Sequence, residues 1–155
     1  MGKMSLDIHN VLENAPGNAK YASPVIQKEI LHIIANKVRA NIREEIGDAK
    51  FCILVDESKD EVKREQMAIV VRFVDTWGYV KERFLQLLHV TNTATLTLKN
   101  QICDVLVSYN LQTHKMRVQG YDGASNMRGG LSRLQALFSK ECPYAYYVHC
   151  FAHRL

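Results

Sequence analysis

Long hydrophobic runs are missing from this chain of 155 residues. Its longest uninterrupted apolar runs hold about five residues, whereas a membrane-spanning helix needs roughly 20. We therefore expect no membrane-spanning helix. Cysteine is also scarce, with only 4 residues in the chain. The spacing of these cysteines is not that of a disulfide scaffold. We expect Cys52 and Cys103 to be free thiols in a reducing compartment.

Two further absences bear on which kinds of ligand or partner the protein binds. The pair Gly129-Gly130 lacks the Gly-Lys-Ser/Thr context of a phosphate-binding loop, and no other motif indicates a small-molecule substrate. A strong charge excess is missing as well, since the net charge is only +4. That value leans toward anionic partners but does not by itself indicate nucleic-acid binding.

The composition is that of an ordinary globular domain, with 47% hydrophobic and 23% charged residues. Residues 1–22 are polar and without a period, and Ala15-Pro16-Gly17-Asn18 has the chemistry of a loop. We expect this segment to be a linker or the remnant of an upstream region. Residues 23–155 are expected to form one folded core.

The folded part is predicted to begin with a long helix. Ser23 and Pro24 suit the N-cap and first helical position, and Gly47 suits the C-terminal end. Apolar residues recur at every fourth position, which predicts one buried stripe. They are Ile26, Ile30, Ile34, Val38, Ile42 and Ile46. Basic residues on the other side of the helix indicate a solvated face, with a DNA-facing role as the alternative.

Short apolar runs then predict strands. The run 51–55 is unbroken and fits a strand covered on both faces, with Asp56-Glu57-Ser58 ending it. Two β-branched runs, 67–74 and 79–90, flank the hairpin connection Asp75-Thr76-Trp77-Gly78. The first three strands are therefore expected to be antiparallel neighbours.

The second half alternates helices and strands. A helix is predicted over 95–109, with Leu98, Ile102, Val105, Leu106 and Tyr109 on its apolar face, and a strand over 116–121. Ser125 can cap the next helix, and a fifth strand is predicted over 145–148. The expected class is α/β, an RNase H-like mixed sheet: a leading helix, a three-strand meander, then αβαβ. In that order the first and fourth strands lie side by side and parallel.

Asp56 and Asp122 follow these two strands, so we expect them to meet at one edge of the sheet. Paired carboxylates there are typical of a site for Mg²⁺ or Mn²⁺, which prefer oxygen ligands. The alternative is that each aspartate only caps a loop or the next helix. A third carboxylate on a later strand or helix is not evident, since Glu141 ends a distant helix. Glu57, beside Asp56, suits a surface position, with a further metal ligand as the alternative.

The closing residues hold half of a zinc-site spacing. Cys150 and His153 form a Cys-x-x-His pair, with His149 beside it. A structural zinc ion needs four ligands, and no second pair stands at a usual distance. A local packing or hydrogen-bonding role for this motif therefore stays open beside the zinc site.

Several of these segments resemble the catalytic core of hAT-superfamily transposases, in particular domesticated copies of the zinc-finger MYM-type protein 1-like group. The resemblance runs from about Ala15 to the last residue. Its motifs are 51–58 (FCILVDES), 65–67, 72–75 and 82–84, then QGYDGASNM at 119–127 and HCFAHRL at 149–155. Val118 and the stretch Gly130-Leu131-Ser132-Arg133 depart from the pattern.

The resemblance implies an RNase H-like domain with an Asp-Asp-Glu triad, in which Asp56 and Asp122 are the two aspartates. The family's Cys-x-x-His pair matches Cys150 and His153. Its third acidic ligand would lie beyond a helical insertion after Leu155, and its zinc-finger DNA-binding domain would precede Met1. The chain is therefore expected to be the front part of a catalytic core, either a truncated product or a fragment.

Two functions follow from this resemblance. One is a metal-dependent DNA transposase core that cuts phosphodiesters and is inactive alone without its third ligand. The other is a domesticated, non-catalytic module that binds DNA or protein in the nucleus. An incomplete core should leave a face of the sheet uncovered, which predicts a protein partner or a homo-oligomer.

Overall fold

The computed structural model describes residues 9–10, 13–17, 20, 23–92, 94–121 and 128–149, without the side chains at 57, 59 and 128–132. The chain forms two compact units, Met1–Val38 and Arg39–Leu155, and each is described by itself. The predicted boundary between a linker at 1–22 and a core at 23–155 stays a prediction. Within the described ranges, no helix is long and apolar enough to cross a membrane.

Helix α2 spans Pro24–Ile46, as predicted. The Ser23 hydroxyl accepts a hydrogen bond from the Ile26 backbone N–H at 3.3 Å, which is the expected N-cap. Gly47 ends the helix with φ of 53°, a left-handed conformation that glycine adopts without strain. Both predicted helix ends are therefore confirmed.

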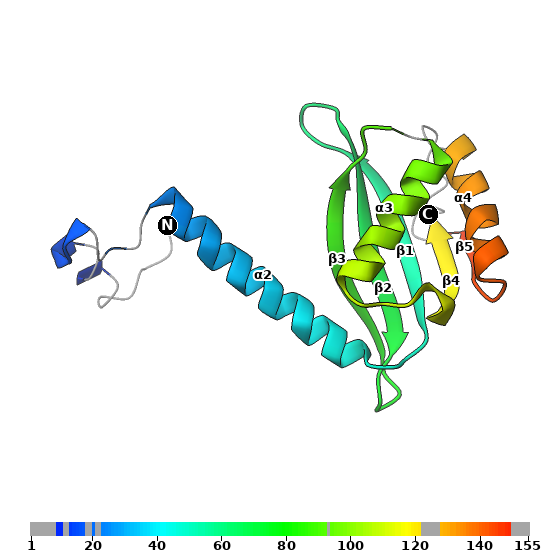
Figure 1. Ribbon diagram of the computed structural model, residues 1–155, viewed down its shortest axis with the longest axis horizontal. Helices are drawn as coiled ribbons and strands as arrows, with labels where there is room; N and C mark the ends of the chain where they lie inside the picture. Colours follow the sequence, from blue (N-terminus) through cyan, green and yellow to red (C-terminus); the bar gives the residue numbers. More distant parts are fainter. Residues whose placement is uncertain are drawn as a thin grey trace. The chain divides into compact units, whose positions relative to one another are not determined.

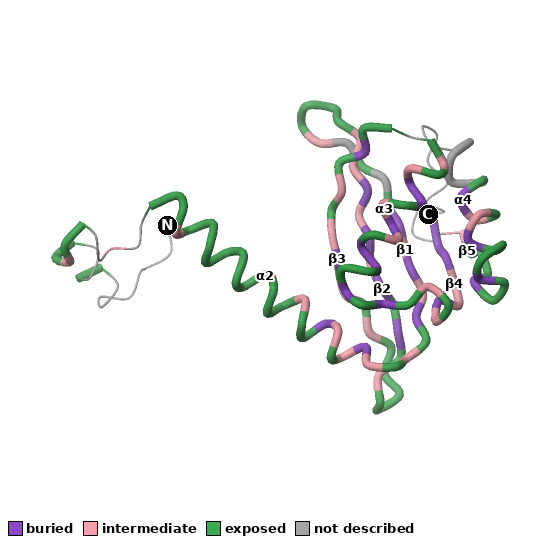
Figure 2. The backbone as a smooth tube through the Cα atoms, viewed as in Figure 1, coloured by how far each residue is buried: buried purple, intermediate pink, exposed green. Residues whose placement is uncertain are grey.

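The predicted burial of the stripe along α2 is wrong for most of its length. Only Ile42 and Ile46 are buried, whereas Ile30, Ile34 and Val38 are exposed (Figure 2). Each step of four residues advances about 40° around a helix of 3.6 residues per turn. From Ile26 to Ile46 the stripe therefore winds through roughly 200°, so a single flat partner cannot cover it.

The second unit holds a five-stranded mixed sheet in the order β3-β2-β1-β4-β5 (Figure 1). The strands are β1 (Phe51–Lys59), β2 (Glu65–Val74), β3 (Val80–His89), β4 (Met116–Tyr121) and β5 (Tyr146–His149). The pairs β1–β2 and β2–β3 are antiparallel, whereas β1–β4 and β4–β5 are parallel. This is the predicted α/β class with an RNase H-like order, and the predicted contact of the first and fourth strands is confirmed.

Strand β1 does not end at Asp56-Glu57-Ser58, as the sequence predicted. Asp56 pairs with Ala68, and the ladder continues to Lys59 opposite Glu65. Because β2 supplies these hydrogen-bonding partners, the polar residues stay in the strand. The turn is confined to 60–64, where the Asp60 carboxylate accepts backbone N–H bonds from Val62 and Arg64 at 3.0 and 2.8 Å.

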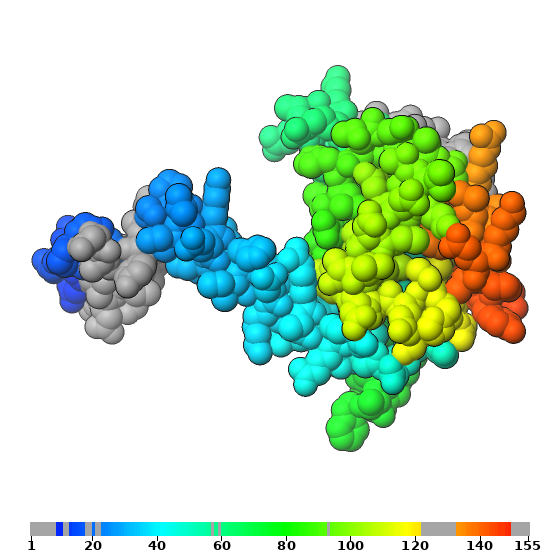
Figure 3. Space-filling model, viewed as in Figure 1, coloured from blue at the N-terminus to red at the C-terminus, as the bar shows by residue number. Residues whose placement is uncertain are grey.

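Helices cover one face of the sheet. Helix α3 (Thr95–Ser108) lies across the strands in Figures 1 and 3 and contacts α4 (Arg128–Glu141). The predicted apolar face of α3 is confirmed: Leu98, Ile102, Val105, Leu106 and Tyr109 are all buried. The Tyr109 hydroxyl also donates to the Leu85 carbonyl at 2.5 Å. The expected Ser125 cap of α4 lies outside the described residues.

The last turn of α2 is tied to β3 by an ion-pair cluster. The Glu45 carboxylate accepts bonds from Arg83 Nη2 at 2.6 Å and from Lys81 Nζ at 3.2 Å. The hydrogen bond from Arg83, and then that from Lys81, hold the pKa of Glu45 below its ordinary value of 4.5, although partial burial opposes them. The cluster therefore favours the ionised form of Glu45 in the folded protein.

This lowered pKa predicts part of the protein's acid sensitivity. A carboxyl group whose pKa is lower in the folded state stabilises the fold above its unfolded pKa, and the contribution disappears as pH falls through the folded pKa. Below about pH 4.5, wild-type stability should therefore fall more steeply than that of a Glu45→Gln variant. Urea denaturation between pH 7 and pH 3 measures both slopes. Equal slopes would show that Glu45 carries no such contribution.

Candidate functional site

Three neighbouring parallel strands, two of which end here, define the candidate site. The register places Val55 of β1 beside Tyr121 of β4, and Tyr121 beside His149 of β5. In the sequence, these three residues are followed directly by Asp56, Asp122 and Cys150. Three of the chemically active residues predicted from the sequence thus follow positions that lie side by side at one edge of the sheet.

Of the two predicted aspartates, the structure describes Asp56. Its side chain is exposed, and it alternates with Val55, which is buried beneath the helices. Asp56 therefore lies on the opposite side of the sheet from α3 and α4. Asp122, the other predicted ligand, lies outside the described residues, and its role stays a prediction.

Of the predicted Cys-x-x-His motif and the histidine beside it, the structure describes only that histidine. His149 is half-buried at the end of β5, whereas Cys150 and His153 lie outside the described ranges. Cys142, the other late cysteine, is buried, and its thiol contacts the Thr113 carbonyl at 2.9 Å. Burial raises the pKa of this thiol, which favours the protonated form over a metal-binding thiolate. The zinc hypothesis stays untested.

Glu141, which the sequence placed at the end of a distant helix, is paired with a lysine of the neighbouring helix. Its carboxylate forms an ion pair with Lys99 of α3, and the Lys99 ammonium also lies 6.0 Å from the centre of the Phe138 ring. Lys99 is largely buried, so this pair joins α3 to α4 beneath the sheet. In the part of the chain that the structure describes, no three histidine, cysteine or acidic side chains gather as metal ligands.

A buried polar network at β4 was missed from the sequence. Gln119 is fully buried, and its amide donates to the carbonyls of Ala145 and Gln135 at 2.7 and 3.2 Å. Its amide oxygen accepts a bond from the Tyr121 hydroxyl at 2.8 Å. Burial raises the pKa of Tyr121, so its hydroxyl stays a donor. The available signal was a glutamine inside a short strand of mainly apolar residues.

This network fixes the strand that leads to Asp122. Gln135 belongs to α4 and Ala145 precedes β5, so one side chain joins three elements. The Tyr121 ring also stacks on Tyr147 of β5, with centroids 5.9 Å apart. The last residue of β4 is therefore held in one orientation, which is what a precise ligand position at the next residue requires.

Carboxylates at this edge suit a hard divalent cation. Mg²⁺ commonly binds through one or two protein carboxylates and keeps several waters or phosphate oxygens as its other ligands. Asp56 has this donor chemistry and an exposed side chain. Among the described residues this aspartate suits an oxygen-preferring ion, whereas a structural zinc ion favours sulfur and nitrogen ligands.

Comparison with known proteins places the chain in a family. A model of the ZMYM1/FAM200 RNase-like domain (DUF4371) matches residues 3–132. The human 52 kDa repressor of the inhibitor of the protein kinase is 23% identical over 139 residues, covering 89% of this chain and 18% of its own length. The mouse protein of the same name is also 23% identical, over 134 residues, with 86% and 18% covered. The chain thus spans about a fifth of these relatives, and by the match of its RNase-like fold and sequence it belongs to the ZMYM1/FAM200 RNase-like domain family.

Proposed function

We propose that this domain derives from a hAT-type transposase core and binds Mg²⁺ or Mn²⁺ through Asp56 and Asp122. The observation that carries the proposal is the parallel register of β1 and β4, which sets Val55 beside Tyr121 directly before the two aspartates. Membership of an RNase-like family supports it. A bound ion would supply positive charge at this edge of the sheet.

We further propose that the domain binds DNA at this edge without cutting it. Two carboxylates leave most positions of a divalent ion open to phosphate oxygens, so the ion can join the protein to a DNA backbone. Cleavage needs closer control of the attacking and leaving oxygens, and Glu141, the acid at the end of α4, is paired with Lys99. Binding without cleavage is the function that this donor set supports best.

The proposed function is compatible with a nuclear, regulatory role. The relatives in human and mouse are named as repressors, and DNA binding without cleavage is compatible with repression. The alternative is an active nuclease or transposase core that recruits its third ligand from outside this chain. The proposed function and this alternative differ in whether the protein breaks phosphodiester bonds.

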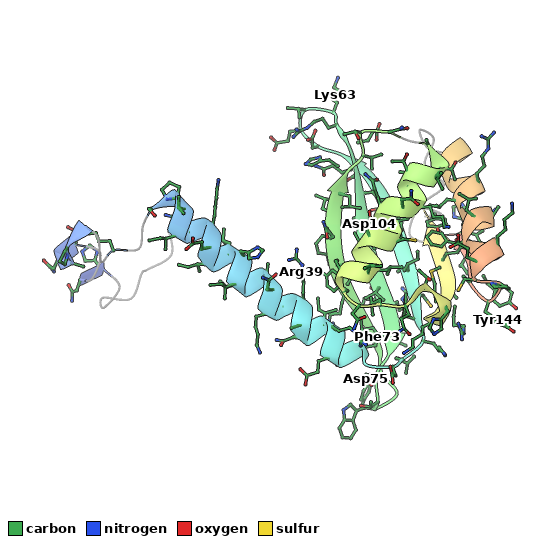
Figure 4. The ribbon with its side chains drawn as sticks, viewed as in Figure 1. Arg39, Lys63, Phe73, Asp75, Asp104 and Tyr144 are labelled. Carbon is green, nitrogen blue, oxygen red and sulfur yellow. The ribbon has the colours of Figure 1, made fainter. Side chains whose placement is uncertain are left out.

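Plasmid nicking separates these two functions. Supercoiled plasmid with Mn²⁺ would be incubated with the wild type, with an Asp56→Asn/Asp122→Asn double variant, and with Asp104→Asn as a matched control. Asp104 lies on the exposed side of α3, away from the site (Figure 4). We expect nicking at background level with all three proteins. Nicking by the wild type and the control but not by the double variant would contradict the non-catalytic proposal.

The same proteins test ion-dependent DNA binding. Fluorescence anisotropy of a labelled duplex should rise with the wild type in Mg²⁺, and it should rise less in EDTA or with the double variant. Each phosphate contact also makes binding weaker as salt increases. Equal binding by all proteins, with and without the ion, would show that the two aspartates do not carry DNA binding.

A further inference from the structure

Two tyrosine rings lie in water at the start of β5. Tyr144 and Tyr146 are 64% and 68% exposed, whereas Ala145 between them is buried. The Ala145 N–H donates to the Cys142 carbonyl at 2.9 Å, and its carbonyl accepts a bond from the Gln119 amide at 2.7 Å. The backbone between the two rings is therefore held in place. A fixed ring left in water offers an apolar face that a second flat ring covers well.

A guanidinium group lies beside the first of these rings. Arg117 is the extra residue of a bulge between β1 and β4, since the register passes from Met116 directly to Val118. Bulges commonly redirect a side chain. Here Nη1 donates to the carbonyls of His114 and Met116 at 2.9 and 3.0 Å, and the guanidinium lies 5.6 Å from the centre of the Tyr144 ring. Carbonyl oxygens carry no net charge, so the positive charge of Arg117 is not neutralised by these bonds.

Further basic residues lie at the starts of β1 and β4. Lys115 forms an ion pair with Asp48, with 2.7 Å between Nζ and Oδ1. The hydrogen bond from Lys115, and then the charges of Arg43 and Lys50, hold the pKa of Asp48 below its ordinary value of 3.8. Three cations thus act on one carboxylate, and Lys50 among them is exposed. Positive charge is therefore in excess around Asp48.

These groups form one patch at the end of the sheet opposite the candidate metal site. Strands β1, β4 and β5 are adjacent and parallel, so their first residues lie together. We call the exposed and half-buried residues there the basic–aromatic patch: Lys50, His114, Lys115, Arg117, Tyr144 and Tyr146. All of them belong to the unit Arg39–Leu155, so their arrangement does not depend on where Met1–Val38 lies. Glu141, the acid closest to Tyr144 in the sequence, is paired with Lys99.

We propose that the basic–aromatic patch binds single-stranded nucleic acid, with phosphates beside the basic side chains and bases stacked on the tyrosine rings. Cations interleaved with exposed aromatic rings are the arrangement by which proteins hold single strands. The bases of a duplex are stacked on one another and cannot cover a protein ring without being unstacked. An acidic peptide would match the positive charge but leave the rings uncovered. Single-stranded nucleic acid is the ligand class that satisfies both features.

This binding goes beyond the function proposed above and is independent of it. The patch supplies its own positive charge and needs no metal ion, whereas the DNA binding proposed at the opposite edge depends on Mg²⁺ or Mn²⁺. The two surfaces also prefer different forms of nucleic acid, because the patch requires unstacked bases. A single-stranded probe in EDTA therefore reports on the patch alone.

Fluorescence anisotropy of a labelled single-stranded DNA oligonucleotide in EDTA tests the proposal. The patch variants are Tyr144→Ala and Lys50→Gln, and the matched controls are Tyr79→Ala and Lys63→Gln. Tyr79 is 68% exposed between β2 and β3, away from β5. Lys63 is exposed in the turn after β1, at the other end of the sheet from Tyr144 (Figure 4). All four side chains are exposed, and circular dichroism checks that each variant folds.

We expect Tyr144→Ala to weaken binding about 5-fold or more, which is the lower end of the effect of losing one base-stacking ring. Lys50→Gln should make the slope of log affinity against log salt shallower by about 0.7, the value of one phosphate contact on a single strand. Both controls should bind like the wild type, and a duplex of the same sequence should bind more weakly than the single strand.

The Asp56→Asn/Asp122→Asn double variant separates this proposal from the metal site. It should bind the single strand like the wild type, so a failure of the metal proposal would leave this result unchanged. Absence of binding by the wild type, equal losses in the patch and control variants, or equal affinity for the duplex would overturn the proposal. Displacement of the oligonucleotide by polyglutamate at the same molar concentration of charge would also overturn it, and would indicate a surface that recognises acidic peptides.

Discussion

Replacing Gln119 with alanine should lower the free energy of unfolding by about 3 kcal/mol. The change removes a fully buried side chain and leaves the Ala145 carbonyl and the Tyr121 hydroxyl without their partner. A buried polar group that loses its hydrogen bond costs about 1–3 kcal/mol, and the empty volume adds to that cost. Urea denaturation at neutral pH measures the loss.

Gln112→Ala is the matched control for this change. Gln112 is exposed at the start of a short 3₁₀ turn, and its side chain makes no capping hydrogen bond. The same substitution there should change stability by less than about 0.5 kcal/mol. Equal effects at the two positions would mean that the amide of Gln119 does not hold β4 against α4.

The second large effect is expected at Leu98. Leu98→Ala should lower the free energy of unfolding by about 3–4 kcal/mol, because the residue is fully buried between α3 and the sheet. Leu96, two residues earlier in the same helix, is 60% exposed. Leu96→Ala should therefore change stability by less than about 0.5 kcal/mol.

Comparing Leu98→Ala with Leu96→Ala separates the effect of burial from the effects of residue type and helix propensity. Both positions lie in the first turn and a half of α3, and both changes replace leucine with alanine. The difference between the two unfolding free energies is therefore the quantity to measure. A difference below about 1 kcal/mol would contradict the assignment of the helix-covered face as the hydrophobic core.

The order of elements was predictable because each has a clear local pattern. The apolar residues of α3 alternate at three and four positions, which keeps them on one side of a helix, and all five are buried. In α2 the repeat is four throughout, so the same kind of pattern winds around the helix. The error there came from treating a four-residue repeat as a straight stripe.

Contacts with residues distant in the sequence determine two features that the sequence did not predict, the length of β1 and the burial of Gln119. Asp56 follows five apolar residues and resembles a strand end, yet β2 pairs with β1 for three residues beyond it. Gln119 could not be identified as buried, because its partners on α4 and before β5 are 16 and 26 residues away. Local propensity contains no information about such partners.

The candidate site was predictable in its topology but not in its chemistry. The strand order places β1 and β4 side by side, with Val55 beside Tyr121, and the alternation of elements already implied this contact. Which ligands complete the site depends on Asp122, Cys150 and His153, none of which lies in the described ranges. Metal binding is therefore the property to measure.

Titration with Mn²⁺, followed by the electron paramagnetic resonance signal of the free ion, tests the central claim most directly. The proteins are the wild type, Asp56→Asn, Asp122→Asn and the control Asp104→Asn. Loss of a supporting group near a metal commonly costs 10–100-fold in affinity, so loss of a direct ligand should cost about tenfold or more.

The account predicts that the wild type and Asp104→Asn bind Mn²⁺ equally, and that each of the other two variants loses about tenfold or more in affinity. That result would place the ion between Asp56 of β1 and the residue that follows β4. Four identical binding curves, or no binding by the wild type, would contradict the claim that these two aspartates form a metal site.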